Sequence, residues 1–196
     1  MNKQTWMTGT LVAATLFTGA AQAAAGDWLV RGRVISVQPS SSSSPVSGVA
    51  ANNKATLEAD FTRFMTDNVA LELILATTKH DISLNGAALG TVGVLPPTLT
   101  VQYHFAPDAT VSPYLGAGLN YTRFYSVSLS SPLSVKNSST GGAIQAGLDY
   151  KINKDMFVNI DIKKIYMETD VTNAGAYLTT LKIDPVVIGV GLGWKF

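Results

Sequence analysis

Charged side chains recur at every second position in several short segments of this 196-residue chain. Arg31 and Arg33 flank a glycine, and Glu58 and Asp60 flank an alanine. A spacing of two places both members of each pair on the same face of a β-strand. Opposite charges gathered on such faces can form ion pairs with one another, which is a structural rather than a catalytic chemistry.

Residue types suited to catalysis are sparse. The chain has two histidines: His80, in a segment that we predict to be a long loop, and His104, on a polar strand face. An enzyme barrel such as a lipid A deacylase needs a nucleophile and a base together on its lipid-facing side. The serine-hydrolase pattern G-x-S-x-G and the usual metal-ligand spacings do not occur in the sequence. We therefore predict that the protein is not an enzyme and has no catalytic residues, no metal and no cofactor.

The N-terminus has the three parts of a secretory signal peptide. Lys3 provides a positive start, residues 6–20 are mostly apolar, and Ala21-Gln22-Ala23 is a small-x-small cleavage site. The apolar run is too short to span a membrane comfortably as an anchor. We predict cleavage near Ala23, with residues 1–23 as the signal peptide and one domain over residues 24–196 outside the cytoplasm.

The composition excludes several classes of protein. Lysine and arginine number 14, aspartate and glutamate 13, and the net charge of +1 includes the signal-peptide lysine. Such a balanced chain has no broad basic field for nucleic acid. There are no cysteines, so disulfides and thiol-ligated metals are excluded. Beyond the signal peptide no stretch reaches the roughly 18 apolar residues of a membrane helix, whereas the strands of a membrane barrel show only alternation.

Eight segments alternate between apolar and polar residues, each close to the length of a tilted transmembrane strand. Tight turns and long connections alternate between them, as in an up-and-down barrel with turns inside and loops outside. The sequence therefore predicts an all-β, eight-stranded antiparallel up-and-down transmembrane β-barrel with strands 27–37, 54–64, 69–78, 98–106, 113–124, 142–151, 156–166 and 183–196. The long connections 38–53, 79–97, 125–141 and 167–182 are expected to be external loops, the first made flexible by its serine run 40–44.

The last of these segments shows the alternation most clearly. From Val186 to Phe196 every second residue is apolar, and the residues between them are mostly glycine. An apolar outer face that ends on an aromatic residue is typical of the closing strand of an outer-membrane barrel. We therefore expect Trp194 and Phe196 to form the assembly signal read by the barrel-assembly machinery.

The cost of charge in lipid decides which face points outward. An ionised group near the bilayer midplane costs about 2–4 kcal/mol, so the charged faces must point into the lumen. This predicts a polar floor in the lumen made of Arg31, Arg33, Glu58, Asp60, Glu72, Gln102, His104, Asp149, Asp161 and Lys163. Toward the long connections the inward positions become apolar and predict a mouth of Ile35, Val37, Ile74, Phe124 and Ile165, which fits either entrance of a small apolar molecule or support of the loops.

Five sequence elements resemble the OmpW family of outer-membrane proteins. They are Leu95 to Phe105, Pro113 to Thr122, Gln145 to Tyr150, Thr66-Asp67-Asn68, and Ile183 to Phe196. The resemblance implies a monomeric eight-stranded barrel, surrounded by lipid in the outer membrane of a Gram-negative cell, with a narrow and partly hydrophobic lumen. It also implies uptake of small hydrophobic molecules, with exit sideways into the membrane.

Pro96 and Pro97 match the proline element of that family. Because proline lacks the N–H that a strand ladder needs, the wall should be weakly paired at these residues. The weak pairing fits a lateral opening in the wall, and it fits equally an ordinary strand end.

Two other kinds of function stay open at this point. A structural or adhesive barrel, or a phage or bacteriocin receptor, would share every strand feature without transporting anything. A soluble lipocalin-like carrier would fit the start Gly26-Asp27-Trp28. Such a carrier needs an apolar inside and a polar outside, however, which is the reverse of these strands. Uptake of a hydrophobic probe distinguishes a transporting barrel from the first alternative. Dependence of the purified protein on detergent distinguishes a membrane barrel from the second.

Overall fold

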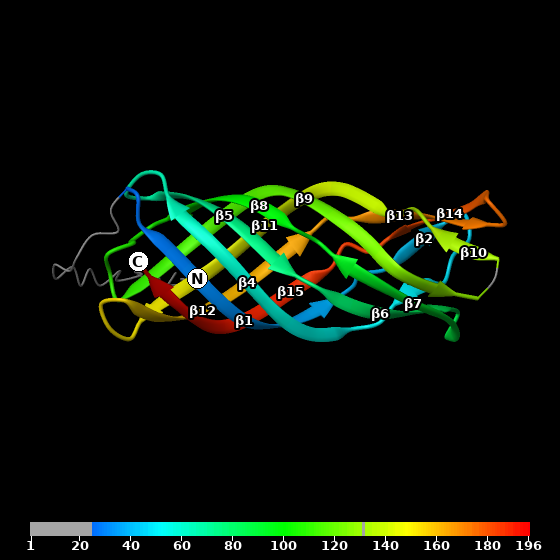
Figure 1. Cartoon of the computed structure of the whole chain (residues 1–196), viewed down its shortest axis with the longest axis horizontal. Helices are drawn as coiled ribbons and strands as arrows, with labels where there is room; N and C mark the ends of the chain where they lie inside the picture. Colours follow the sequence, from blue (N-terminus) through cyan, green and yellow to red (C-terminus); the bar gives the residue numbers. More distant parts are fainter. Residues whose placement is uncertain (1–24, 131) are drawn as a thin grey trace, which may run out of the picture.

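The computed structural model describes residues 25–130 and 132–196, so the predicted signal peptide lies outside the described residues. Strands make up the regular structure of the described part (Figure 1). In chain order they are β1 (Trp28–Gln38), β2 (Ser42–Ser44), β3 (Val49–Ala51), β4 (Lys54–Phe64), β5 (Val69–Ala76), β6 (Thr78–Leu84), β7 (Ala87–Leu95), β8 (Thr98–His104), β9 (Val111–Leu129), β10 (Leu133–Val135), β11 (Ser138–Lys151), β12 (Met156–Ile165), β13 (Glu168–Asn173), β14 (Ala176–Lys182) and β15 (Val186–Lys195).

Eight of these strands close into a ring. The order around the ring is β1, β4, β5, β8, β9, β11, β12 and β15, with antiparallel pairing throughout, and β15 pairs back to β1. The β1–β15 ladder runs from Leu29 opposite Lys195 to Gln38 opposite Val186, so neither strand leaves a free edge. The eight-stranded antiparallel barrel predicted from the sequence is confirmed.

The tight turns lie at one end of the barrel, together with the start of β1 and the end of β15 (Figure 1). Backbone hydrogen bonds join these two ends: Trp28 N donates to Phe196 O at 3.1 Å, and Phe196 N donates to Trp28 O at 2.9 Å. This arrangement follows from the even number of barrel strands, because each strand reverses the direction of the one before it.

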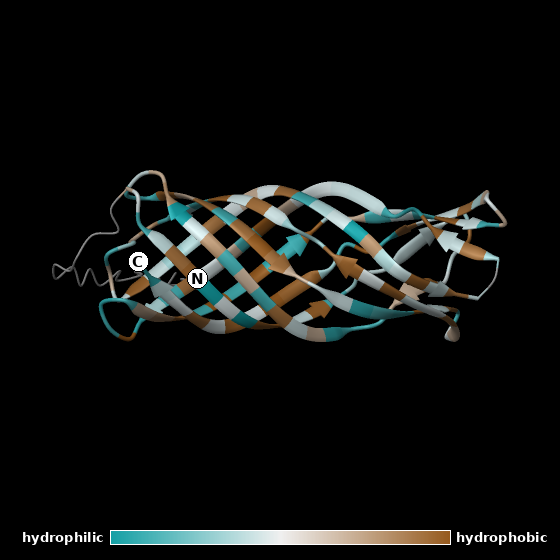
Figure 2. Cartoon of the chain, in the orientation of Figure 1, coloured by the Kyte–Doolittle hydropathy of each residue, from teal (hydrophilic) through white to brown (hydrophobic). Residues whose placement is uncertain are grey.

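Alternating hydropathy assigns the two faces of the wall (Figure 2). Apolar side chains that point outward are exposed, for example Val34 at 57 %, Leu57 at 73 % and Val190 at 54 %, whereas inward Arg31 and Asp60 are fully buried. An apolar belt of this extent is suited to lipid rather than to water. Among the described residues no helix is long and apolar enough to cross a membrane.

The prediction that the long connections are loops is wrong. Most of 79–97 forms a β6–β7 hairpin that continues β5 and β8 away from the turns, and 167–182 contains the β13–β14 hairpin. The turn residues of both hairpins, Asn85-Gly86 and Ala174-Gly175, have the positive φ angles of a type I′ turn. The wall of the barrel is therefore longer than the eight predicted segments.

The remaining connections are also partly in strands. β9 continues to Leu129 and pairs with β7, and β11 begins at Ser138, four residues earlier than predicted. The serine run expected to be flexible contains β2, which pairs with β14. At the other end of the chain, β15 begins at Val186 rather than residue 183, because Pro185 has no N–H to donate.

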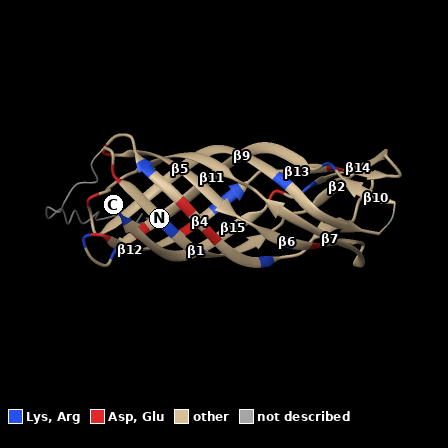
Figure 3. Ribbon diagram, viewed as in Figure 1, with Lys and Arg blue, Asp and Glu red and all other residues tan. Residues whose placement is uncertain are grey.

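The interior of the barrel has two layers. Charged and polar side chains fill the layer nearer the turns, and Figure 3 shows acidic and basic positions on neighbouring strands in the middle of the barrel. The layer nearer the hairpins is an apolar cluster of Ile35, Val37, Val49, Ile82, Val92, Val94, Phe124, Ala143, Ile165, Met167, Val171, Leu181 and Val187. The candidate site lies at the boundary between these two layers.

Candidate functional site: an apolar cavity above an ionic plug

The polar layer contains an ionic plug made of Arg31, Arg33, Glu58, Asp60, Glu72, Asp149, Asp161 and Lys163, each at most 5 % exposed. Strand register explains how it forms. In the β1–β4 ladder Arg31 lies directly opposite Asp60, and Arg33 lies opposite Glu58. Residues opposite one another on antiparallel strands have Cβ atoms about 4.5–5.5 Å apart, so equal spacings of two produce two facing ion pairs.

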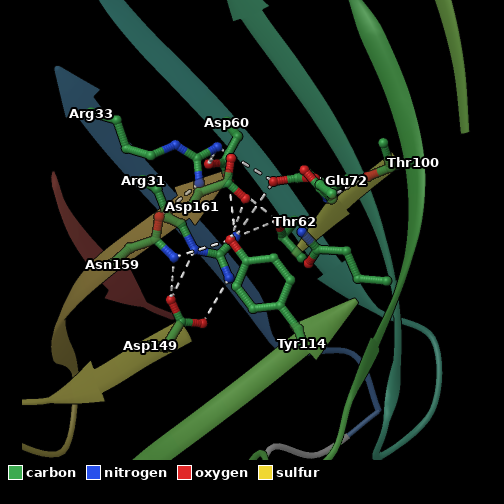
Figure 4. Close-up of polar contacts among 12 residues, drawn as sticks. Arg31, Arg33, Asp60, Thr62, Glu72, Thr100, Tyr114, Asp149, Asn159 and Asp161 are labelled. Atoms are coloured by element: carbon green, nitrogen blue, oxygen red, sulfur yellow. Dashed lines mark hydrogen bonds and ion pairs between the residues drawn. The ribbon is translucent and has the colours of Figure 1, made fainter. Parts of the chain in front are cut away.

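Arg31 is held by carboxylates from two sides of the lumen (Figure 4). Its Nη1 lies 3.0 Å from Asp60 Oδ1, and its Nη2 lies 2.8 Å from Asp149 Oδ2 on β11. Nη1 also donates a hydrogen bond of 2.8 Å to Thr62 Oγ1. The fixed fork of the guanidinium thus joins β1, β4 and β11 across the barrel.

Arg33 and Lys163 share the carboxylate of Glu58. Arg33 Nε lies 2.8 Å and Lys163 Nζ 2.7 Å from Glu58 Oε1, and Lys163 Nζ also lies 2.8 Å from Asp161 Oδ1. Arg33 makes a further ion pair with Asp60. Since these groups are shut off from water, losing one partner would leave a buried charge uncompensated.

Neutral side chains complete the plug. Glu72 Oε2 accepts hydrogen bonds from Thr100 Oγ1, at 2.7 Å, and from Gln145. Tyr114 OH donates a hydrogen bond of 2.9 Å to Asp161 Oδ2. Its ring stacks on His104 with centroids 5.0 Å apart. These contacts extend the polar network around the ion pairs, and the buried apolar cluster of Leu29, Phe64, Ala70 and Phe157 lies nearer the turns.

The ten residues predicted for the polar floor all point into the lumen and are buried. The sequence pattern alone did not reveal Tyr114, which is 1 % exposed. The alternation along β9 could have predicted its inward orientation, because Tyr114 lies an even number of residues from the inward Asn120. Gly147, directly opposite on β11, leaves room for the tyrosine ring.

Above the plug lies an apolar cavity of about 280 Å³. All five residues predicted for the mouth, Ile35, Val37, Ile74, Phe124 and Ile165, line it. Strands outside the eight predicted segments supply much of the remaining wall, with Val49, Ile82, Val92, Val94, Val171 and Leu181 among the lining residues. The predicted loops therefore form part of a container for an apolar molecule.

One histidine lies in the wall of this cavity. His80 belongs to β6 rather than to a loop, is 5 % exposed and lines the cavity. Its Nδ1 lies 2.7 Å from the backbone oxygen of Asn52. Burial lowers the pKa of its imidazole below the ordinary value, an effect that the neighbouring Lys54 charge reinforces and that the Asn52 hydrogen bond and Asp81 oppose.

The wall beside the cavity is interrupted between two strands. The β5–β8 ladder ends at Ile74 opposite Thr98, and the β6–β7 ladder begins at Thr78 opposite Val94. Between them residues 75–77 face residues 95–97, which include Pro96 and Pro97. Their carbonyl groups are turned to other partners, since Asn120 Nδ2 lies 3.1 Å from Pro96 O and 3.3 Å from Pro97 O.

A shallow apolar groove lies on the outer face at the same height. Leu57, Leu75, Leu95, Val190, Leu192 and Trp194 are among the residues that line it. Glu58, Ala76 and Thr77 line both this groove and the inner cavity. Only a thin part of the wall therefore separates the cavity from the lipid-facing surface. Trp194, 41 % exposed, and Phe196, 75 % exposed, lie near the turn end of the outer surface.

The sequence model of the OmpW family matches residues 24–196 of this chain. The chain belongs to the OmpW family. Among OmpW-like sequences, the outer-membrane protein y4mB of Sinorhizobium fredii is 40 % identical over 183 residues, covering 86 % of this chain and 80 % of the relative. Outer membrane protein W of Vibrio cholerae is 36 % identical over 194 residues, covering 87 % and 89 % of the two chains.

Solved structures agree with the family assignment. The crystal structure of OprG from Pseudomonas aeruginosa superposes with a TM-score of 0.79 at 26 % identity, covering 88 % of this chain and 97 % of OprG. The NMR structure of outer membrane protein W from Escherichia coli gives a TM-score of 0.67 at 30 % identity, covering 89 % and 100 % of the two chains. As an OmpW-family member, this chain is a protein of the Gram-negative outer membrane.

Within residues 25–130 and 132–196, no group of three or more histidine, aspartate or glutamate side chains is arranged to hold a metal ion. The carboxylates of the ionic plug are instead directed at arginine and lysine.

Proposed function

We propose that this OmpW-family barrel is a passive channel for small hydrophobic molecules, which enter at the hairpin end and leave sideways into the membrane. The observation that carries the proposal is the apolar cavity of about 280 Å³ that ends on a buried ionic plug. A pocket lined mainly by aliphatic and aromatic side chains takes up apolar molecules because it removes their surface from water.

The ionic plug makes straight passage along the barrel axis unfavourable. An apolar molecule on that route would have to separate Arg31 from Asp60 and Asp149, which lie 3.0 and 2.8 Å away. Breaking a buried ion pair costs about 3–5 kcal/mol, and an apolar molecule offers no replacement partner. Exit through the wall avoids this cost.

The interrupted ladder offers a route through the wall. Residues 75–77 and 95–97 are not paired with one another in the β5–β8 or β6–β7 ladder, and Pro96 lines the cavity. On the outer side Leu75 and Leu95 line the apolar groove. A molecule that crossed here would move from one mainly apolar surface to another without separating the ion pairs of the plug.

The name of one relative supports the substrate class. The dibenzothiophene metabolism operon protein PahQ of Pseudomonas aeruginosa is 29 % identical over 167 residues, covering 78 % of this chain and 76 % of PahQ. Dibenzothiophene is a small apolar aromatic compound. We propose that the cavity of this chain takes molecules of the same class.

We further propose that the barrel is not an enzyme. Ser112 Oγ and His104 Nδ1 lie 3.5 Å apart, which is long for an activated nucleophile. His104 Nε2 lies 3.0 Å from Gln102 Oε1, so the ring is oriented by an amide rather than by a carboxylate. One chain supplies all of the residues described as lining the cavity, so a monomer surrounded by lipid suffices for the proposed function.

The test is uptake of a fluorescent hydrophobic probe by liposomes with and without the protein. We expect wild-type protein to accelerate uptake, and we expect a variant with Pro96→Val and Pro97→Val to lose most of this effect because its ladder can close. Pro113→Val is the matched control, since Pro113 lies on β9 near the turns and away from the interruption.

The outcomes separate the alternatives. Unchanged uptake in the double variant would exclude lateral exit at these prolines. Absence of uptake by the wild-type protein would exclude transport and favour a structural, adhesive or receptor barrel. Single-channel recordings should show little ion conductance, because the plug closes the lumen.

A further inference from the structure

His80 lines the apolar cavity, and the geometry around its ring determines which of its two nitrogens carries a hydrogen. His80 Nδ1 lies 2.7 Å from Asn52 O, and a backbone carbonyl oxygen can only accept a hydrogen bond. Nδ1 must therefore carry the hydrogen. In the neutral ring the proton is then absent from Nε2, which becomes a hydrogen-bond acceptor.

The Asn52 carbonyl is held firmly in place. Asn52 N donates to Asp81 O at 3.1 Å, Asp81 N donates to Asn52 Oδ1 at 2.9 Å, and Asn52 Nδ2 donates to Asp81 Oδ2 at 2.7 Å. Lys54 Nζ lies 2.9 Å from the same Asp81 oxygen. This network fixes the carbonyl, and the carbonyl in turn fixes the tautomer and the orientation of the His80 ring.

Nε2 is the remaining polar atom of that ring. Within the described part of the chain it has no hydrogen-bond partner, although the side chain is 5 % exposed and lines the cavity. An acceptor that has no protein partner and belongs to a residue lining an apolar cavity favours a ligand that supplies a hydrogen-bond donor. Water satisfies it in the absence of ligand only at the cost of wetting an apolar space.

Three of the hydroxyl groups around the cavity already donate hydrogen bonds within the protein. Thr56 Oγ1 donates to Thr77 O at 2.8 Å, Thr98 Oγ1 to Pro96 O at 3.0 Å, and Thr169 Oγ1 to Lys136 O at 2.9 Å. At the floor Glu58 is already paired with Arg33 and Lys163. Thr56, Thr98 and Thr169 are therefore already engaged as donors, whereas Nε2 of His80 is an acceptor without a protein partner.

We propose that His80 is a specificity-determining residue of the cavity, and that its Nε2 accepts a hydrogen bond from the hydroxyl group of an otherwise apolar ligand such as a phenol or an alcohol. This inference rests on the proposed function and narrows its substrate class. A net hydrogen bond of the usual strength corresponds to a preference of about fivefold to tenfold over a matched compound without the donor.

Three probes of similar shape test the proposal: naphthalene, 1-naphthol and 1-methoxynaphthalene, which has the same oxygen but no donor. Binding to the folded barrel in detergent micelles is measured for each and corrected for the partition of the probe into protein-free micelles. Wild-type protein should bind all three and prefer 1-naphthol by about fivefold to tenfold.

Two substitutions test the roles of the two ring nitrogens of His80 separately. In His80→Asn the amide nitrogen can still donate to Asn52 O, but no atom replaces Nε2. In His80→Gln the longer side chain can place an acceptor oxygen near the Nε2 position. We expect the ratio of 1-naphthol to naphthalene affinity to fall to about one in His80→Asn, and to stay partly raised in His80→Gln.

A ring-nitrogen chemical shift provides a second readout on the wild-type protein. Nε2 of His80 should have the shift of a bare imine nitrogen, and 1-naphthol but not 1-methoxynaphthalene should move it toward the hydrogen-bonded value. Circular dichroism of each variant checks that the barrel is folded.

Each outcome decides a different point. If naphthalene binds but 1-naphthol is not preferred, or if His80→Asn keeps the preference, the role of His80 is overturned and the cavity remains a binding site for apolar molecules. If no probe binds the folded wild-type barrel, the proposed function itself fails. Preference in wild type, its loss in His80→Asn and the specific shift change together support the proposal.

Discussion

Gly147 on β11 lies directly opposite Tyr114 on β9, and a Cβ atom added to Gly147 would come within 2.2 Å of the Tyr114 ring. The glycine therefore makes room for the ring whose hydroxyl group holds Asp161 at 2.9 Å. This contact connects one small residue in the wall to the order of the ionic plug.

Replacing Gly147 with alanine should push the Tyr114 ring out of position and destabilise the barrel by about 1–3 kcal/mol, as overpacking of a core does. The midpoint of urea unfolding in lipid vesicles measures the change. Gly32→Ala is the control, because nothing lies within 4 Å of a Cβ at Gly32. Equal midpoints for both variants would show that Tyr114 adapts without cost.

Removing Arg31 should destabilise the barrel more than Gly147→Ala does. The change Arg31→Met leaves Asp60 and Asp149 without the guanidinium that lies 3.0 and 2.8 Å from them, and we expect a loss of about 3–5 kcal/mol in the free energy of unfolding. Adding Asp60→Asn and Asp149→Asn to Arg31→Met should restore part of the stability, since the uncompensated charges are then gone.

Lys154→Met provides the comparison for Arg31. Lys154 pairs with Asp155 at 3.7 Å in a turn where both side chains are exposed, so its removal should change the unfolding midpoint little. If Arg31→Met behaved like Lys154→Met, the ion pairs would not stabilise the lumen.

A charge on the outer face should impair insertion. Leu73 on β5 and Val190 on β15 are 39 % and 54 % exposed on the surface assigned to lipid. Lysine at either position should cost about 2–4 kcal/mol if it lies near the midplane. The fraction of protein that folds into vesicles measures this, with Ile152→Lys in the β11–β12 turn as the control. Normal insertion of Leu73→Lys and Val190→Lys would refute the assignment of this face to lipid.

The preference for hydroxyl-bearing probes should depend on pH. Because the pKa of His80 is lowered from its ordinary value of 6.5, the ring is neutral above that value and Nε2 accepts. As the pH falls below 6.5 through the lowered pKa, Nε2 gains a proton and the acceptor is lost, together with any stability that the neutral buried ring provides.

The ratio of 1-naphthol to naphthalene affinity between pH 7.5 and about pH 4 tests this expectation. The charged groups that act on His80 are Lys54 on β4, which lowers its pKa, and Asp81 on β6, which raises it; Glu58 on β4 lines the same cavity. His80→Gln should show no such loss, because an amide does not titrate in this range. A ratio in wild type that is constant with pH would contradict the role of Nε2.

The sequence alone was sufficient to predict the strands that cross the membrane and the orientation of their two faces. There the two faces differ as much as possible: Val34 must meet lipid while Arg33 beside it must avoid lipid, so parity leaves one orientation. The same argument placed the charged residues of the plug and the five mouth residues inside the barrel.

The strands above the membrane could not be recognised in this way. On β6, His80 and Ile82 point inward, whereas Lys79 and Asp81 point outward into water. The period of two persists, but the outer face is polar, so a search for apolar outer faces misses it. The Asn85-Gly86 dipeptide was the signal that would have revealed the hairpin.

Contacts across the lumen were also beyond the sequence. The pairing of Arg31 with Asp60 follows from two adjacent strands, but its second partner, Asp149, is 118 residues away. Which side chains meet across a ring depends on its diameter and on the stagger of its strands. Neither quantity can be read from a single strand.

The plug also constrains how the barrel is made. Arg31 and Arg33 lie on the first strand, while Asp149 and Asn159, which bind them, lie 118 and 126 residues later. A hairpin of β1 and β4 that entered the bilayer alone would expose arginines to hydrocarbon with only half of their partners. Insertion into the bilayer and closure of the barrel should therefore occur together. Each charged side chain then exchanges water for its ion-pair partners without contact with the acyl chains.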